Sequence, residues 1–327
     1  MTDYTLNERR SLPRVEQAQA HLLKAIGART PAGTVTAERL TRYTQDRLAA
    51  GARPATVNKE LAALRRGFRL ARRAGRVSEI PPISLLEERN VRTGFYEAPE
   101  YQAVRDRLPA DVRPLVACLY LTGWRLGEVL RLAWPQVDFQ VGVVRLEPET
   151  TKNRDGRVFP FAALPELAAL LTAQRTMTTA CERATGRIIP AVFHRDGAPI
   201  RDFRGAWEQA CIGAGFFRVL NPEAPENQQQ RKVTKLLHDF RRTAVRNLER
   251  AGVPRSVAMK LTGHKTEAVY RRYAIVSEGD LAEGVAKLAT LHQALADKAS
   301  RTVISLQEVA PVVAPGVQPR RQRRRAG

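Results

Sequence analysis

The chain has 327 residues, of which 43% are hydrophobic, and this length and composition suit two domains with ordinary buried cores. The formal net charge is +21, spread along the chain, which favours a polyanionic partner such as nucleic acid. The three cysteines are far apart and lack metal-ligand spacing, so they support neither a disulfide framework nor a zinc site. No stretch is apolar enough for a signal peptide or a membrane span, so we expect a cytoplasmic, nucleoid-associated protein with no membrane partner.

The amino-terminal part of the chain is predicted to form a small helical domain over residues 15–90. A polar leader over residues 1–14 is expected to be flexible. Apolar residues then recur at helical spacing, which predicts helices over residues 14–26, 37–50 and 56–74. Two consecutive prolines and the charged residues after them predict a linker that ends this domain.

The third of these helices carries many cations outside its apolar stripe. Such a helix can pack inward on one face and bind phosphates with the other, with a solvated surface as the alternative. We predict DNA contact for its cations, which are Lys59, Arg65, Arg66, Arg69, Arg72 and Arg73.

The second domain is predicted over residues 94–298 as mainly helical with a small sheet. The β-rich runs 143–147 and 157–161 flank the polar turn 150–156, which predicts a hairpin with Lys152 close to its tip. The helices expected in this domain cover residues 99–108, 112–121, 125–132, 164–174, 204–214, 238–251, 254–261, 267–272 and 280–299.

Two segments are expected to lack regular structure for at least part of their length. Residues 221–230 are polar and predict a loop. The C-terminal segment 299–327 has an apolar patch over residues 303–313 and ends in a basic tail that is predicted to be disordered.

One stretch of the second domain carries residues suited to phosphate chemistry. His238 and Arg241 lie three residues apart and would share one face of a helix. A histidine exchanges protons near neutral pH, and an arginine fork matches two phosphate oxygens. In isolation, a capping histidine and a surface arginine explain the same pattern.

Residues far upstream could serve the same site. Arg125 follows Thr-Gly-Trp where a helix restarts, so unpaired backbone N–H groups suited to an anion are expected there. Glu128 could hold the Arg125 guanidinium, with a structural ion pair as the alternative. Lys152 could donate a proton to a leaving oxygen, although most turn lysines are only solvated.

Two tyrosines, Tyr270 and Tyr273, compete as candidate nucleophiles. They lie at i and i+3 and could share a helix face, so spacing does not choose between them. A phenol is a useful nucleophile only where cations stabilise the developing phenolate. The alternative is that both are core aromatics.

Five motifs in the second domain resemble those of the tyrosine recombinase (phage integrase) family. In order they are LTGWRLGEVLRLAW, the TKN turn, HDFRR, LTGH and VYRRYAIV, and the resemblance covers about residues 95–276. The helix with TVNKELAALRRGFRLA resembles the core-binding domain of that family. The resemblance implies an α+β protein, mainly α with a small β-sheet, in which a helical core-binding (SAM-like) domain precedes a mixed α/β catalytic domain.

The resemblance also implies a reaction and assigns roles in it. A recombinase of this family breaks a DNA strand by tyrosine attack, leaving a 3′-phosphotyrosine and a free 5′-hydroxyl, and rejoins it without a metal or any cofactor. Arg125 and Arg241 would clamp the scissile phosphate, and Lys152 would be the general acid. His238 would assist proton transfer around the nucleophile, and His264 would hydrogen-bond the phosphate.

The same resemblance chooses between the tyrosines. The nucleophile of the family follows the LTGH histidine by nine residues, which selects Tyr273 over Tyr270. Glu128 matches the acidic position that supports the first arginine.

The implied partners are double-stranded DNA at attachment or core sites and further copies of the chain, in a tetramer. An accessory DNA-bending protein is a candidate partner, and residues 303–313 are a candidate contact with a neighbouring protomer or an intramolecular strand. The expected use is integration or excision of a mobile element. The alternatives are chromosome or plasmid resolution by the same chemistry, a type IB topoisomerase, and a non-catalytic DNA-binding protein on the same fold.

Overall fold

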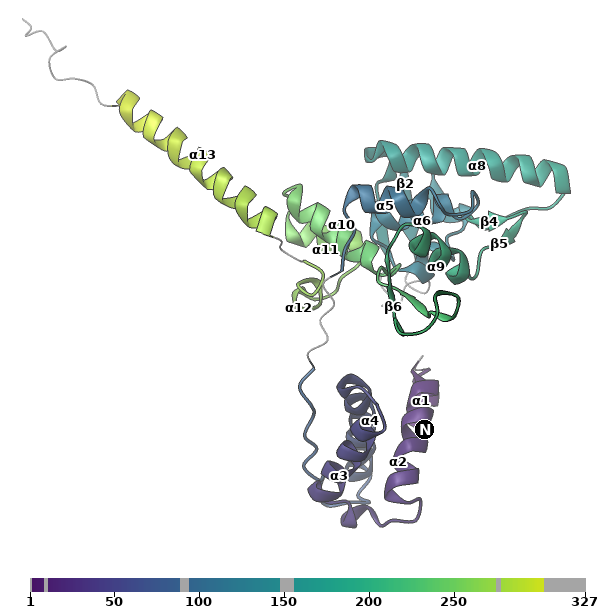
Figure 1. The fold of residues 1–327 in the computed structure, drawn as a ribbon, viewed down its shortest axis with the longest axis vertical. Helices are drawn as coiled ribbons and strands as arrows, with labels where there is room; N and C mark the ends of the chain where they lie inside the picture. Colours follow the sequence, from purple (N-terminus) through teal and green to yellow (C-terminus); the bar gives the residue numbers. More distant parts are fainter. Residues whose placement is uncertain (1, 9–10, 89–93, 148–155, 275–277, 303–327) are drawn as a thin grey trace, which may run out of the picture. The chain divides into compact units, whose positions relative to one another are not determined.

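The computed structural model shows an α+β chain, which confirms the predicted fold class (Figure 1). The chain divides into two compact units, residues 1–93 and 94–327. Within the described residues, no helix has the length and apolar character needed to cross a bilayer. The described residues are 2–8, 11–88, 94–147, 156–274 and 278–302.

The first unit is helical. Its buried core includes Tyr43, Val57, Leu61, Phe68 and Ile83, so the proline-rich segment after the last helix also packs into this unit. Proline at the first position of the longest helix explains why that helix begins two residues before the predicted start. Its elements are α1 (Thr2–Leu6), α2 (Leu12–Ile26), η1 (Ala32–Thr34), α3 (Ala37–Ala49) and α4 (Pro54–Arg73).

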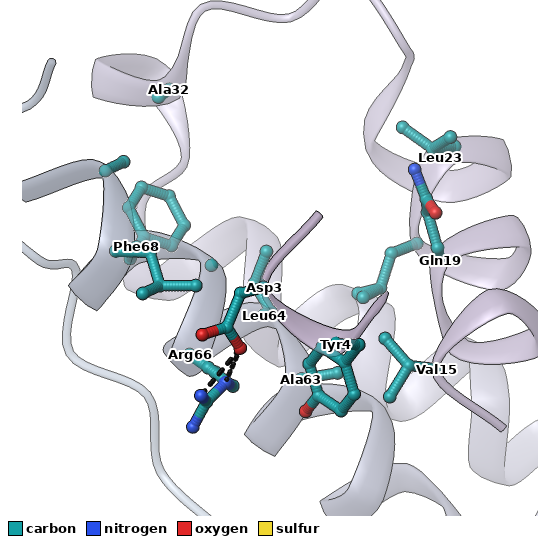
Figure 2. A pocket seen from close by; sticks show the side chains of 14 residues that line it. Asp3, Tyr4, Val15, Gln19, Leu23, Ala32, Ala63, Leu64, Arg66 and Phe68 are labelled. Atoms are coloured by element: carbon teal, nitrogen blue, oxygen red, sulfur yellow. Dashed lines mark hydrogen bonds and ion pairs between the residues drawn. The ribbon is translucent and has the colours of Figure 1, made fainter. Parts of the chain in front are cut away.

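The leader differs from its prediction. Residues 1–14 were expected to be flexible, whereas α1 forms there and α2 begins at Leu12. The Asp3 carboxylate accepts a hydrogen bond from Arg66 at 2.6 Å, and the Arg66 guanidinium lies 5.3 Å from the centre of the Tyr4 ring (Figure 2). Side chains of α1, α2 and α4 line a mainly apolar cavity of about 330 Å³. These contacts, which no local pattern in the leader reveals, hold α1 in place.

Glu60 is the buried anion of the first unit. Its carboxylate accepts hydrogen bonds from the Tyr43 hydroxyl at 2.6 Å and from Arg47 at 2.8 Å. Burial, which outweighs the nearby arginine, raises the pKa of Tyr43, and its bond to Glu60 adds to the rise. Glu60 therefore joins α3 to α4 and does not lie on the exposed basic face of α4.

We expect Glu60→Ala to lower the free energy of unfolding by about 3 kcal/mol, because it removes the carboxylate that both the buried Tyr43 hydroxyl and the partly buried Arg47 bind. Urea unfolding of the full chain, followed by circular dichroism, measures this change. Glu38→Ala is the matched control, since its side chain is 85% exposed and lies 3.8 Å from Arg42, and it should cost less than about 0.5 kcal/mol. Equal losses in the two variants would contradict a structural role for the buried cluster.

The second unit is built mainly from helices. The helices are α5 (Ala98–Arg105), α6 (Arg113–Thr122), α7 (Leu126–Val129), α8 (Pro165–Thr185), α9 (Arg204–Gly213), α10 (Asp239–Arg250), α11 (Arg255–Thr262), α12 (Glu267–Tyr270) and α13 (Glu278–Thr302), with the 3-10 turns η2 (Trp134–Gln136), η3 (Phe161–Ala163) and η4 (Glu226–Gln228). The strands are β1 (Val137–Asp138), β2 (Val143–Leu146), β3 (Arg157–Phe159), β4 (His194–Arg195), β5 (Ala198–Pro199), β6 (Phe217–Val219) and β7 (Arg231–Val233).

The predicted hairpin is confirmed as the antiparallel pair β2–β3, to which β1 adds a third strand. Val144 pairs with Phe159 and Leu146 with Arg157, so these four side chains share the inward face. Lys152, predicted near the tip, lies outside the described residues. The strands β6 and β7 were not predicted; they border the loop expected over residues 221–230.

An aromatic cluster fixes α10 against α5, α6 and α9. Phe240 is fully buried, and its ring stacks on Tyr96 with centroids 4.6 Å apart. Trp207 meets the Phe240 ring edge-on at 5.5 Å, and Tyr101 does so at 6.0 Å. Because Phe240 sits one residue before Arg241, this packing sets the position of the catalytic candidate beside it.

Candidate active site

Two helix ends with the same sequence, Leu-Thr-Gly, frame the site. The glycines Gly123 and Gly263 end α6 and α11 in the left-handed conformation, with φ of 63° and 69°. The preceding threonines, Thr122 and Thr262, each donate their hydroxyl to the carbonyl four residues earlier at 2.7 Å. A Cβ on Gly123 would lie 2.5 Å from that of Ala244, so the close approach of α10 requires glycine there.

Arg241 lies on the first turn of α10 and is 1% exposed. It donates from Nη1 to the Gly123 carbonyl at 2.8 Å and from Nε to Nε2 of His264 at 3.2 Å. Burial and the nearby Arg125 lower its pKa. Its Nη2 has no hydrogen-bond partner in the described part of the chain, so a buried cationic donor remains available to a ligand.

Arg125 is held by Glu128, as the sequence predicts, and its side chain is 21% exposed. Its Nη1 lies 2.9 Å from the Glu128 carboxylate, and Nη2 reaches the Gly263 carbonyl at 3.4 Å. The start of α7 does not offer the backbone anion site that was expected from the sequence. The helix has only four residues, and the backbone N–H of Arg125 donates to Glu128 at 3.0 Å. The anion at this helix start is therefore the protein's own carboxylate.

Arg157 is a member of this cluster that the sequence reasoning missed. It lies on β3, and its Nη2 donates to the second oxygen of Glu128 at 2.6 Å. Its Nη1 reaches the Thr262 carbonyl at 3.5 Å, and its guanidinium lies 5.1 Å from the Trp124 ring centre. The available signal was strand alternation, which places Arg157 on the same inward face as an apolar residue, Phe159.

His264 is buried and neutral. Because the Thr262 hydroxyl donates to a main-chain carbonyl, it accepts from Nδ1–H of His264 at 2.7 Å. Nε2 is then the acceptor for Arg241. Burial first, and then repulsion by Arg241, Arg125 and Arg157, lowers the pKa of His264 to about 3. Both ring nitrogens are engaged, so His264 orients Arg241 in this structure, and its predicted bond to a phosphate stays a prediction.

The lowered pKa of His264 gives the stability a pH dependence. Below the ordinary pKa of 6.5, His264 binds a proton in the unfolded chain but stays neutral in the folded chain. The unfolding free energy should therefore fall as the pH is lowered toward 3. This residue contributes at most about 1.4 kcal/mol per pH unit. Urea unfolding at a series of pH values from about 4.5 to about 7.5 measures this dependence. The unfolding free energy should change less steeply with pH in His264→Gln than in the wild type. An unchanged slope in His264→Gln would refute the assignment.

Tyr273 lies within this group of side chains. Its hydroxyl is 3.0 Å from Nε2 of His238. The guanidinium carbons of Arg241 and Arg242 lie 5.6 and 5.4 Å from the centre of its ring. His238 is exposed, but surrounding atoms still remove part of its solvation, and this desolvation, followed by repulsion from Arg242 and Arg241, lowers its pKa. A neutral imidazole can accept the proton of the phenol.

Tyr270 has a different environment. It is fully buried and packs with Val245 and Ala258. Burial is the main cause that raises the pKa of its hydroxyl. Since α12 ends at Tyr270, the two tyrosines do not share a helix face. The Tyr273 hydroxyl contacts His238 and its ring lies beside Arg241 and Arg242. The Tyr270 hydroxyl is instead influenced by Glu249 and Arg255, which favours Tyr273 as the nucleophile.

The cations predicted for DNA contact divide into two groups. Arg65 donates to the Ile83 carbonyl and Arg66 to Asp3, so these two are half-buried and serve the packing of the first unit. The others are exposed; they are Lys59, Arg69, Arg72 and Arg73. Their contact with DNA stays a prediction.

Sequence comparisons place this site among known proteins. The model of the phage integrase family matches residues 86–279, more than half of the chain. The integrase of Salmonella phage P22 is 24% identical over 218 residues, which cover 63% of this chain and 50% of that protein. The chain thus spans half the length of this relative.

Solved structures share the fold. The Tn1549 transposon integrase in complex with transposon right end DNA superposes with a TM-score of 0.62 at 14% identity, over 87% of this chain and 97% of that one. Lambda integrase, as a dimer bound to a COC′ core site and as a tetramer bound to a Holliday junction, gives a TM-score of 0.60 at 15% identity in each case. Both cover 82% of this chain and 72% of theirs.

Proposed function

Because the chain belongs to the phage integrase family, we propose that it is a site-specific DNA recombinase that cleaves and rejoins strands through Tyr273. The observation that carries this proposal is the 3.0 Å contact between the Tyr273 hydroxyl and His238, close to Arg241, whose Nη2 has no hydrogen-bond partner among the residues that the structure describes. A phenol, an imidazole and guanidinium groups thus lie together, which supports the roles of nucleophile, base and phosphate ligands in phosphoryl transfer.

The cleavage step follows from these positions. The Tyr273 oxygen attacks the phosphorus and its proton passes to Nε2 of His238, while the bond between phosphorus and the 5′ oxygen breaks. Lys152 would give that oxygen its proton, a role that comes from the family resemblance. The products are a 3′-phosphotyrosine and a free 5′-hydroxyl. Religation is the reverse reaction with another 5′-hydroxyl, and the phosphodiester energy is kept in the intermediate.

The arginines stabilise the charge that gathers on the phosphate oxygens during this attack. Arg125 and Arg241 are the clamps on the non-bridging oxygens. A well-placed donor in such a site contributes about 3 to 4 kcal/mol. Among the described residues, no carboxylate contacts Arg241, so its charge is not neutralised internally. His264 would keep that guanidinium in its plane.

The partners and biological use extend the same proposal. Double-stranded DNA is the substrate, and four copies of the chain would act together on two sites, in keeping with the lambda integrase tetramer on a Holliday junction. Integration or excision of a mobile element, in the cytoplasm and near the nucleoid, is the use we propose, and an accessory DNA-bending protein is a further proposed partner. Chromosome or plasmid resolution would use the same residues.

The test is a covalent-capture assay. The full chain is incubated in EDTA with a nicked duplex that carries the attachment sequence from the DNA flanking the gene, so that the released 5′ fragment is lost. We expect a denaturant-resistant protein–DNA adduct joined to the 3′ phosphate. DNA binding without an adduct would support the non-catalytic alternative. Relaxation of supercoiled plasmids that lack the sequence would support the topoisomerase alternative.

A further inference from the structure

We propose that Arg157 is a positioning residue that neutralises Glu128, so that Arg125 keeps its positive charge for the scissile phosphate. The inference rests on the proposed function and deepens it. It concerns a residue on the sheet, outside the motif positions that carry the family resemblance.

The geometry shows one carboxylate shared by two arginines. Glu128 is 2% exposed; one of its oxygens lies 2.9 Å from Arg125 and the other 2.6 Å from Arg157. If Arg157 were absent, the buried pair of Arg125 and Glu128 would be neutral overall. With Arg157 present, the three groups together carry one net positive charge, and Arg125 is the more exposed of the two arginines.

The reaction explains why this charge matters. A phosphodiester carries one negative charge, and a second accumulates as the phenol oxygen attacks. His264 is neutral, and the lowered pKa of His238 keeps it neutral before it takes the proton. The net charge of the site before attack therefore depends on Arg125, Arg157, Arg241 and Glu128, which together carry two positive charges. Loss of Arg157 would leave one.

Arg157 is placed to act through Arg125. Its side chain is 8% exposed, compared with 21% for Arg125, so it lies behind the residue that meets the ligand. Its Nη1 reaches the Thr262 carbonyl at 3.5 Å, next to the Gly263 carbonyl that holds Arg125. A Cβ at position 263 would overlap the Arg157 guanidinium, so the end of α11 leaves room for this side chain.

The first measurement is the single-turnover cleavage rate of the full chain on the nicked duplex. Arg157→Met should be slower by about 100-fold, the order lost with one electrostatic donor. Arg157→Lys, which keeps the charge, should stay within about tenfold of the wild type. Arg145→Met is the matched control, an exposed cation on the neighbouring strand β2, and should change the rate by less than about threefold.

Two further comparisons separate charge compensation from packing. Adding Glu128→Gln to Arg157→Met restores two net positive charges, so the double variant should cleave about tenfold faster than Arg157→Met alone. A duplex with an uncharged methylphosphonate at the cleavage position should show a smaller penalty for Arg157→Met than the natural phosphodiester. A purely structural role predicts a slower double variant and equal penalties on both duplexes.

The outcomes are distinguishable. If the wild type forms no adduct, the proposed function fails and the inference with it. If the wild type cleaves and Arg157→Met keeps its rate, or the double variant is no faster than Arg157→Met, the inference alone is overturned. If Arg157→Met melts below the assay temperature, the cleavage rate of Arg157→Lys decides the question. A rate about 100-fold below that of the wild type, in a variant with the wild-type melting temperature, overturns the inference. A rate within about tenfold of the wild type supports it.

Discussion

Tyr273→Phe is expected to abolish the covalent protein–DNA adduct, with a loss of at least about 10³-fold in cleavage rate. The substitution removes one oxygen, the only atom of this side chain that can attack phosphorus. It leaves the ring against Arg241 and Arg242, so affinity for DNA should change by less than about threefold. Denaturing electrophoresis measures the adduct, and a native gel shift measures binding.

Tyr270→Phe is the matched control for this result. The ring of Tyr270 is fully buried beside Val245 and Ala258, and its hydroxyl is outside the contact between His238 and Tyr273. Adduct formation should therefore continue in this variant. An adduct formed by Tyr273→Phe but not by Tyr270→Phe would show that the nucleophile has been assigned to the wrong tyrosine.

Arg241→Met is expected to separate activity from stability. Cleavage should fall by about 10² to 10³-fold, because a donor to the developing charge is lost. The free energy of unfolding should change by no more than about 2 kcal/mol, because two opposing contributions nearly cancel. Two hydrogen bonds from the guanidinium cation are lost at about 1.5 to 3 kcal/mol each, whereas removal of a buried guanidinium that has no carboxylate partner among the described residues gains several kcal/mol.

Arg242→Met provides a control for stability on the same helix. Arg242 pairs with the fully buried Asp239 at 3.0 Å, so its removal takes away a counter-charge and should lower the unfolding free energy. Added sulfate should raise the melting temperature of the wild type more than that of Arg241→Met, because the anion binds the folded site. A destabilised Arg241→Met with unchanged cleavage would contradict the role assigned to Arg241.

Local patterns predicted the β2–β3 hairpin and the presence of the helices, because helical and strand periodicity depends on neighbouring residues. Two bounds, for example, were wrong: α7 covers only Leu126–Val129 of the expected 125–132, and α8 continues past the expected end at residue 174 to Thr185. The site candidates could be named from motifs whose members lie close together, such as His238 with Arg241. The role of Arg157 could not be predicted in this way, because it depends on contacts between β3 and the ends of α6 and α11. These three segments are distant from one another in the sequence. The short leader helix α1 and the strands β6 and β7 also depend on tertiary contacts that override weak local preferences.

The two arginines that would clamp the phosphate each rest on a main-chain carbonyl, Arg241 on that of Gly123 and Arg125 on that of Gly263. A side-chain acceptor can be deleted by one codon change, whereas a peptide oxygen is present whatever residue occupies the position. The partial negative charge at a helix end also attracts a cation without cancelling it. Single substitutions therefore cannot remove these carbonyl acceptors. The substitutions that would disturb them are those that add a Cβ at Gly123 or Gly263, where a side chain would collide with Ala244 or Arg157.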